Sequence, residues 1–406
     1  MNRLANIEAA TLLAPSPPVA DCRGACLPTP AGATIDRLYS HCLLSLRQPA
    51  LAAIESASAS CVGWIRNYLD KLREAIARQP AHDFVAAFRP AVAFFHLDPL
   101  VIKRNPVEAG LGLVRFLVGG PNSAPAEFLV PEQAIPKNGL YFPHLNIVLA
   151  SGCGPLAVQS DGDGAKFTWV DGVAATVPAN GLGTPATFDS ERMMGLEWAA
   201  GWPILNRAPE ARDPLLPVSP APTGRPAAAD LAVIESAQEL LREVWPEAYT
   251  ATRRYLHSAM LQPVQPDRWT STTTDLLQGT LIASCANPIQ VADAMCHEGS
   301  HARLHLFLRV DPLIEDNGAQ IYESPWRPDN RPLMGLLKGV HAFVNVALFY
   351  SRLGEQHPEM AAHAGQIYDE QRAKVRRAWA TFMPRARPTR LGASLIAELD
   401  SVVRSL

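Results

Sequence analysis

A proline-dense segment, residues 202–226 (WPILNRAPEARDPLLPVSPAPTGRP), divides this chain of 406 residues. Proline has no backbone N–H and a fixed φ, so such a segment cannot sustain a helix or a central strand. The chain also exceeds the roughly 250 to 300 residues that one hydrophobic core usually serves. We therefore expect two or more packed subdomains, with a connector at 202–228.

The part before the connector divides into three regions. Residues 1–33 are rich in Pro, Ala and Gly without a period, which predicts a loosely held arm. Residues 34–105 are expected to form a helical layer, because apolar side chains recur there at steps of three and four. In the second predicted helix these are Val62, Ile65, Leu69, Leu72 and Ile76.

Residues 106–201 are expected to form a β-rich middle region. Short apolar runs such as LVRFLVGG (113–120) and NIVLASG alternate there with turn residues. Asp-Gly-Asp-Gly at 161–164 lies between two such runs, and glycine accepts the positive φ of tight turns. This pattern predicts a hairpin within a small antiparallel sheet.

Residues 229–406 show helical periodicity almost to the end of the chain. The predicted fold class is therefore α+β: a helical N-terminal layer, a small antiparallel β-rich middle and a helical C-terminal domain.

The composition of the chain limits the classes of partner that we expect it to bind. The net charge is −3, with 18% charged and 48% hydrophobic residues, so no broad cationic field is available for nucleic acid or a membrane surface. No apolar run reaches the roughly 18 residues of a membrane span, and the seven scattered cysteines are typical of reduced thiols. We expect a cytoplasmic protein whose partners are small molecules or proteins; nothing in the sequence specifies an oligomeric state.

The segment MCHEGSHARLH (295–305) contains His-Glu-x-x-His. On a helix, His297 and His301 lie one turn apart on one face, where both imidazoles can reach one ion. The alternative is a histidine pair facing solvent. The apolar surroundings favour a metal site, because ionisable groups there need a bonding partner.

A third protein ligand is required, and two candidates follow the motif. His341 lies on the apolar helix LMGLLKGVHAFVNVALF, whereas Glu323 directly precedes SPWRPDNRP, a poor helix context. We favour His341, and Glu323 stays as the alternative. His305 is about 12 Å along the helix axis from His297, too far to share an ion, which suits packing or support of a ligand.

The loop YESPWRPDNRP joins the two predicted ligand-bearing helices. Arg327 and Arg331 are four residues apart between prolines, and Trp326 can wall a pocket. Guanidinium groups bind carboxylates in a bidentate manner, so the loop suggests recognition of a carboxylate. The alternative is that Asp329 merely pairs with these arginines.

The stretches ANPIQVADAMCHEGSHARL and SPWRPDNRPLMGLLKGV lie in a segment, about 240–353, that resembles the HExxH domain of iron- and 2-oxoglutarate-dependent peptide β-hydroxylases, the αKG-HExxH type associated with ribosomally made, modified peptides. The resemblance covers roughly a third of the chain. It implies a fold other than the cupin barrel, Fe(II) held by His297 and His301, 2-oxoglutarate and O2 as co-substrates, and a precursor peptide as substrate. Arg327, Arg331 and Trp326 then become the candidates for the 2-oxoglutarate site.

The expected function is thus Fe(II)/2-oxoglutarate-dependent hydroxylation of a peptide β-carbon, in which Glu298 orients a ligand or water near the metal. The first alternative is a zinc metallopeptidase with Glu298 as the general base. The second is a non-catalytic peptide-binding scaffold.

Overall fold

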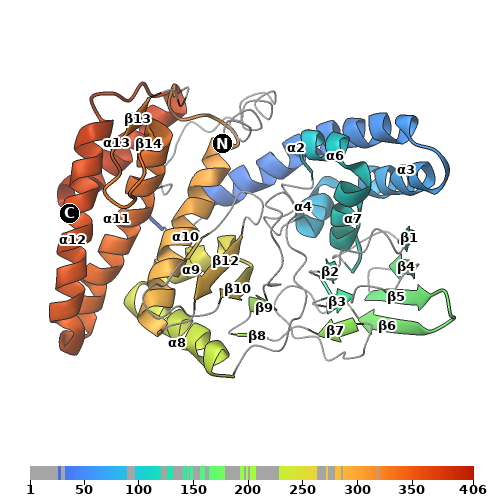
Figure 1. Ribbon diagram of the computed structural model, residues 1–406, viewed down its shortest axis with the longest axis horizontal. Coiled ribbons are helices and arrows are strands. Elements are labelled where there is room, and N and C mark those ends of the chain that lie inside the picture. The colour runs from blue at the N-terminus through green and yellow to red at the C-terminus, as the bar shows by residue number, and fades with distance from the viewer. Residues whose placement is uncertain are drawn as a thin grey trace.

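Helices predominate in the described part of the chain, and the C-terminal region is helical, in agreement with an α+β class (Figure 1). The computed structural model describes residues 26–28, 33–88, 97–119, 126–130, 140–142, 144–145, 147–149, 156–160, 164–178, 193–195, 198–199, 202–206, 228–262, 271–272, 279–284, 287–316, 318 and 320–406. The predicted arm therefore lies largely outside the described residues, as does the predicted connector after its first strand.

The predicted helical N-terminal layer is present. It consists of α2 (Ala33–Ser60), α3 (Gly63–Arg78), α4 (Ala81–Ala87) and α6 (Pro99–Arg104). In α3 the apolar stripe is buried at Leu69, Leu72 and Ile76, whereas Val62 precedes the helix and is 79% exposed. The spacing of these apolar residues therefore predicted the helix correctly, although α3 begins at Gly63, one residue after Val62.

The expectation of a β-strand in LVRFLVGG is wrong, because its first five residues, 113–117, belong to α7 (Pro106–Leu117). Nearly every apolar side chain of this run is buried, including Leu113, Val114 and Phe116. A run that is apolar on all sides has no detectable period, so a buried helix and a buried strand look alike in sequence.

The predicted antiparallel sheet and its hairpin are confirmed. The strands β1 (Ala126–Val130), β4 (Leu156–Ser160), β5 (Gly164–Trp169) and β6 (Ala174–Pro178) form one sheet in the order β1-β4-β5-β6. The β4–β5 pair flanks the Asp-Gly-Asp-Gly turn, with Ser160 opposite Ala165. A second antiparallel sheet contains β2 (Leu140–Phe142), β3 (Ile147–Leu149) and β7 (Met193–Gly195).

A third sheet lies where the sequence indicated a connector and helices. Its order is β11-β12-β10-β9-β8, from β8 (Trp198–Ala199), β9 (Trp202–Asn206), β10 (Ser258–Gln262), β11 (Ser271–Thr272) and β12 (Thr280–Ser284). The central strand β10 pairs in parallel with both β9 and β12. The connector thus begins inside a sheet, and the C-terminal half is not purely helical. Such five-residue strands are shorter than any window in which periodicity can be read.

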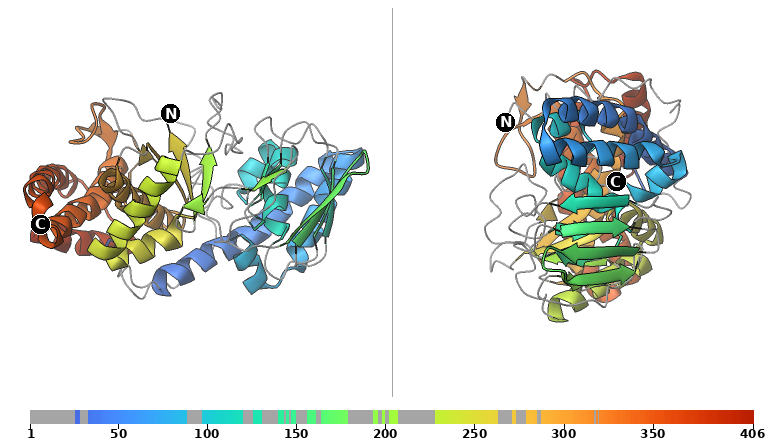
Figure 2. Two further views of the ribbon diagram at one scale, coloured as in Figure 1. Left: turned by 90° about the horizontal axis from the view of Figure 1, so that it is seen from below. Right: turned by 90° about the vertical axis from the view of Figure 1, so that its right-hand side faces the viewer.

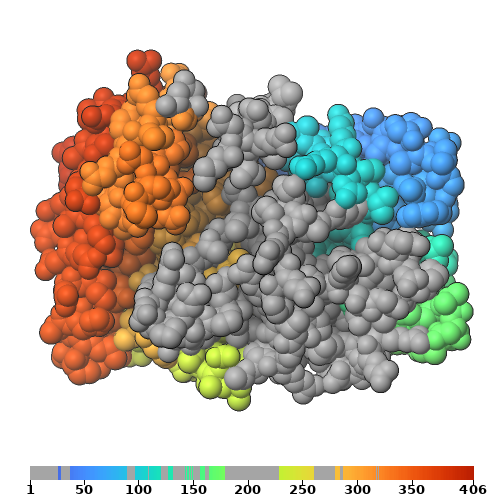
Figure 3. Space-filling view, viewed as in Figure 1, coloured from blue at the N-terminus to red at the C-terminus, as the bar shows by residue number. Residues whose placement is uncertain are grey.

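The C-terminal helices agree with the prediction. They are α8 (Ala228–Val244), α9 (Pro246–Tyr255), α10 (Pro288–Leu308), α11 (Leu333–Gln356), the 3-10 turn η4 (Pro358–Met360), α12 (Ala361–Phe382) and α13 (Arg390–Ser405). A two-stranded ribbon of β13 (Ile321–Tyr322) and β14 (Arg331–Pro332) encloses the arginine loop. These helices form one end of the molecule and the N-terminal helices form the other (Figure 3).

The motif helix α10 is central to the fold. Asn287 caps it by accepting a bond from the backbone N–H of Gln290 at 3.0 Å, and Pro288 opens it at a position where no N–H is needed. It packs against α2, α8, α9 and α11, and the long α2 reaches it from the N-terminal layer (Figure 2). The motif is therefore held on a helix with little freedom to shift.

A buried cation anchors α10 to its neighbours. The Arg303 guanidinium donates to the Asn345 Oδ1 on α11 at 3.1 Å and to the Cys26 backbone carbonyl at 3.3 Å. Asn345 Nδ2 donates to the same Cys26 carbonyl at 3.0 Å. A buried charge needs such partners, because an unsatisfied one costs several kcal/mol.

Among the helices that the structure describes, α11 alone is long and apolar enough to cross a bilayer. Two-thirds of its most apolar window is buried within the protein, 67% by count, and it packs against α10 and α12. Its hydrophobicity is accounted for by this central position.

Candidate metal centre

The two motif histidines point their rings at one position. The Nε2 atoms of His297 and His301 are 3.1 Å apart, and the rings are nearly perpendicular, at 80°. With metal–nitrogen bonds of about 2.1 Å, this separation corresponds to a nitrogen–metal–nitrogen angle of about 95°. Both octahedral and tetrahedral coordination lie near that value, so the pair is spaced to share one ion.

Glu298 completes a compact group. Ligand atoms of His297, Glu298 and His301 all lie within 4.8 Å of one another, and no other such group of histidines, cysteines and acids occurs in the described ranges. Glu298 is only 2% exposed, while both histidines are partly exposed. A carboxylate beside the position of an ion can bind it, orient a ligand or take a proton from water.

The electrostatics favour neutral imidazoles. Burial lowers the pKa of His301 well below its usual value, and the neighbouring His297, His305, His341 and Lys338 lower it further. Burial also lowers the pKa of His297, although the charge of Glu298 opposes this. Neutral imidazoles keep the lone pairs that a metal requires.

The two candidates for a third ligand lie in different surroundings. His341 is fully buried on α11 and close enough to His301 to lower its pKa. It is not a member of the compact group of three. The side chain of Glu323 is 80% exposed, with its Oε1 atom 3.9 Å from an Arg377 nitrogen.

The loop predicted to face the metal contacts the motif through one aromatic side chain. Trp326 stacks on Phe343 of α11, and Phe343 packs edge-on against the ring of His297, with centroids 4.7 Å apart. The indole Nε1 of Trp326 donates to the Gln371 Oε1 on α12 at 3.1 Å. The loop, α11, α12 and the histidine helix therefore meet at Trp326.

Two glycines of GLLKG allow the loop to lie this close to α11. A Cβ atom at Gly339 would be 2.8 Å from Cζ3 of Trp326, and one at Gly335 would be 3.1 Å from Cβ of Arg331. Real Cβ contacts are almost never as short as the first of these, and the second is tighter than nine in ten of them. Small residues are thus required where the indole and the arginine cross the helix.

The loop arginines pair with Asp329. A terminal nitrogen of Arg331 is 2.8 Å from Oδ2, and Nε of Arg327 is 3.5 Å from Oδ1. Their side chains are 33% and 61% exposed, respectively. An incoming carboxylate would have to compete with Asp329 for these cations.

Sequence reasoning missed three residues around this centre: Phe343, Gln371 and Asp293. On an apolar helix Phe343 cannot be told from a core residue. Asp293 did carry a signal, because it precedes His297 by four residues and so lies on the same face of α10.

A comparison with protein-family models finds none that matches the chain, and no curated protein matches it significantly.

Proposed function

We propose that this protein is an Fe(II)- and 2-oxoglutarate-dependent oxygenase that hydroxylates a side-chain β-carbon in a ribosomally made precursor peptide. The single observation that carries the proposal is the 3.1 Å separation of the two Nε2 atoms beside a loop that carries arginines. A peptidase has no need of a cationic loop, whereas a dicarboxylate co-substrate does. The resemblance of the HExxH segment and its PWRPDNRP loop to the peptide β-hydroxylases points the same way.

In this proposal His297 and His301 hold the metal and His341 is the third protein ligand. Iron bound with 2-oxoglutarate supplies the oxidising chemistry that exchanges a C–H hydrogen for hydroxyl, with O2 as oxidant. Arg331 and Arg327 exchange Asp329 for the distal carboxylate of the co-substrate. Trp326 and Phe343 keep water from one side of the imidazoles, and Glu298 orients a ligand or a water molecule.

The proposal includes a scaffold other than a cupin barrel, supported by the position of both histidines on α10 rather than on strands. It also includes a cytoplasmic location and no role for nucleic acid or a membrane, which rest on the net charge of −3 and on the burial of α11.

A zinc metallopeptidase is the second candidate, and one observation favours it. The Glu298 carboxylate lies within 4.8 Å of the ligand nitrogens, where a general base for metal-bound water would be. A non-catalytic peptide-binding scaffold is the third.

Anaerobic titration with Fe(II) and 2-oxoglutarate separates the three. The oxygenase is expected to develop a weak visible charge-transfer band that the His297→Ala/His301→Ala double variant lacks. His82→Ala, at an exposed histidine of α4 away from α10, is the control and should keep the band. Absence of the band together with zinc-supported peptide cleavage would establish the peptidase. Peptide binding that is unchanged in the double variant, without either activity, would establish the scaffold.

A further inference from the structure

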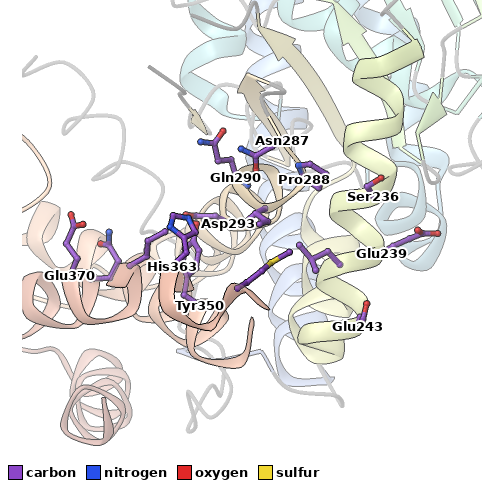
Figure 4. A pocket seen from close by; sticks show the side chains of 15 residues that line it. Ser236, Glu239, Glu243, Asn287, Pro288, Gln290, Asp293, Tyr350, His363 and Glu370 are labelled. Atoms are coloured by element: carbon purple, nitrogen blue, oxygen red, sulfur yellow. Dashed lines mark hydrogen bonds between the residues drawn. The ribbon is translucent and has the colours of Figure 1, made fainter. Parts of the chain in front are cut away.

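A second feature lies on the same face of α10 as the histidines, toward its N-terminal end. A pocket of about 720 Å³ is bounded by α8, the first turns of α10, α11 and α12 (Figure 4). Asp293 and Tyr350, which are hydrogen-bonded to each other, line it together with His363, and Glu239 and Glu243 on α8 and Glu370 on α12 also contribute. None of the side chains that line it is a lysine or an arginine.

Two of these four acids already have a basic side chain as a neighbour. Glu370 accepts a hydrogen bond from Lys374 at 2.5 Å, and Oε1 of Glu243 is 3.6 Å from Nε2 of His357. Glu239 and Asp293 form no ion pair with the residues that the structure describes. The pocket therefore has two acidic side chains, Glu239 and Asp293, without an ion-pair partner among the described residues.

Asp293 is the unusual one, because it is only 8% exposed. Its Oδ2 accepts from the Tyr350 hydroxyl at 3.1 Å, and within the described ranges its Oδ1 has no hydrogen-bond partner. A carboxyl group removed from water normally has all its oxygens satisfied. Here the open oxygen belongs to a side chain that lines the pocket.

The pocket does not resemble a metal site. Among the described residues, only the cluster of His297, Glu298 and His301 brings three ligand atoms within 4.8 Å. The acids of the pocket are spread over a larger space, which suits an organic cation carried on an apolar stem. Leu240, Ile289 and Ile367 provide the apolar wall for such a stem.

A chain of side-chain contacts joins the pocket lining to the histidine centre. Gln371 lines it and accepts the indole hydrogen bond of Trp326, which stacks on the phenylalanine that touches His297. Along α10, Asp293 and His297 are one turn apart, about 6 Å. An extended peptide covers about 3.4 Å per residue, so one chain can reach both.

We propose that this pocket binds the ammonium or guanidinium group of a lysine or arginine in the substrate peptide, with Asp293 and Glu239 as counter-charges. The assignment rests on the proposed function and specifies its substrate class. Because an extended peptide covers about 3.4 Å per residue, we expect the substrate peptide to carry a basic residue within roughly three positions of the residue that is modified.

The test compares two probes that differ only in charge: the acetylated, amidated pentapeptide Ala-Ala-Arg-Ala-Ala and its citrulline counterpart. Binding to the full chain is measured by saturation-transfer NMR in EDTA, without metal or 2-oxoglutarate. The arginine peptide is expected to bind about tenfold or more tightly than the citrulline peptide. Asp293→Asn should remove most of that preference and Glu239→Gln should reduce it. Glu235→Gln, one turn away on the exposed face of α8, is the matched control and should retain it.

Equal binding of the two peptides, or a preference that survives both pocket variants, would overturn the proposal. If Asp293→Asn fails to fold by circular dichroism, the double variant Glu239→Gln/Glu243→Gln takes its place, because both side chains are exposed positions of α8. Because this binding assay contains no metal, a negative result overturns only the pocket proposal. The oxygenase proposal is tested separately by the charge-transfer band. A charge preference in a protein that shows no band would keep the pocket and refute the oxygenase.

Discussion

The indole of Trp326 lies flat on the ring of Phe343, with centroids 4.6 Å apart and planes inclined by 4°. This contact joins the arginine loop to the helix that follows it. Because Phe343 also touches His297, we expect a displacement of the indole to be transmitted to this proposed metal ligand.

Gly339→Ala tests that transmission. The added methyl group would be 2.8 Å from the Trp326 ring, so the indole must move. We expect the charge-transfer band with Fe(II) and 2-oxoglutarate to shift or weaken while iron still binds. Gly365→Ala on α12 is the matched control, since a Cβ there meets nothing within 4 Å. It should leave the band unchanged and stabilise the fold by up to about 1 kcal/mol. A band unaffected by Gly339→Ala would show that the indole has no influence on the centre.

The pairing of Arg331 with Asp329 predicts that substitutions of the two residues change the 2-oxoglutarate requirement in opposite directions. Arg331→Ala should raise the 2-oxoglutarate concentration needed for half-saturation by up to roughly a hundredfold, because a charged contact is lost. Asp329→Asn should lower it, because the competing carboxylate is gone. Titration of the band with 2-oxoglutarate measures both, and Arg327→Ala is expected to act like Arg331→Ala. If all three variants titrate like the parent protein, the co-substrate does not bind at this loop.

His341→Ala should lower iron occupancy, measured by metal analysis after gel filtration. A buried imidazole on α11 next to His301 is the expected third ligand, whereas Glu323 is directed to the surface beside Arg377. Glu323→Gln should therefore retain iron. The reverse pattern would assign the third position to Glu323.

Asp293 should make stability depend on pH. Burial raises its pKa to about 7 from a usual value of 3.8, with Glu298 adding to the rise and the Tyr350 hydrogen bond opposing it. Above pH 4 the unfolded chain releases this proton, while the folded protein keeps it until about pH 7. The free energy of unfolding therefore falls as pH rises through this range.

Asp293→Asn removes that slope. Between pH 5 and pH 8 the variant should gain roughly 2 to 3 kcal/mol relative to the parent protein, from about 1.4 kcal/mol per pKa unit. Urea denaturation at both pH values in EDTA measures the difference. Parallel stability curves would mean that Asp293 is ionised in the folded protein.

Thr389 is expected to contribute to stability at the other end of the C-terminal region. Its hydroxyl oxygen caps α13 by accepting from the Gly392 N–H at 3.0 Å and itself donates to Asp311. Thr389→Val should lower the free energy of unfolding by about 1 to 2 kcal/mol, whereas Thr389→Ser should nearly preserve it. Thermal denaturation compares the two, and an equal loss in both would show that the hydroxyl cap alone does not account for the effect.

How much of the fold could be predicted from the sequence depended on the length of each helix or strand. Helices of more than twelve residues, such as α3 and α11, contain several turns and therefore a readable period. The five-residue strands β10 and β12 do not, and β9, the other parallel partner of β10, lies more than fifty residues earlier in the chain. Because parallel pairing is non-local, nothing near Ser258 in sequence indicates it.

In the candidate centre, too, the features that depend on local sequence could be predicted and those that depend on packing could not. The spacing of His297 and His301 is local, and the 3.1 Å approach of their nitrogens follows from one helical turn. The stacking of Trp326 on Phe343 and the hydrogen bond to Gln371 depend on how three segments pack. Both alternatives for Arg331 were visible in the loop, and only coordinates reveal its pairing with Asp329.

Cys26, near the start of the described chain, is held from three later segments: by Arg303, by Asn345 and through its own thiol at the carbonyl of Leu395. During synthesis on the ribosome, its surroundings stay incomplete until Leu395 has emerged. The histidine helix is therefore enclosed only after α13 has been made, and a nascent chain that lacks α13 would expose apolar surface to chaperones and proteases.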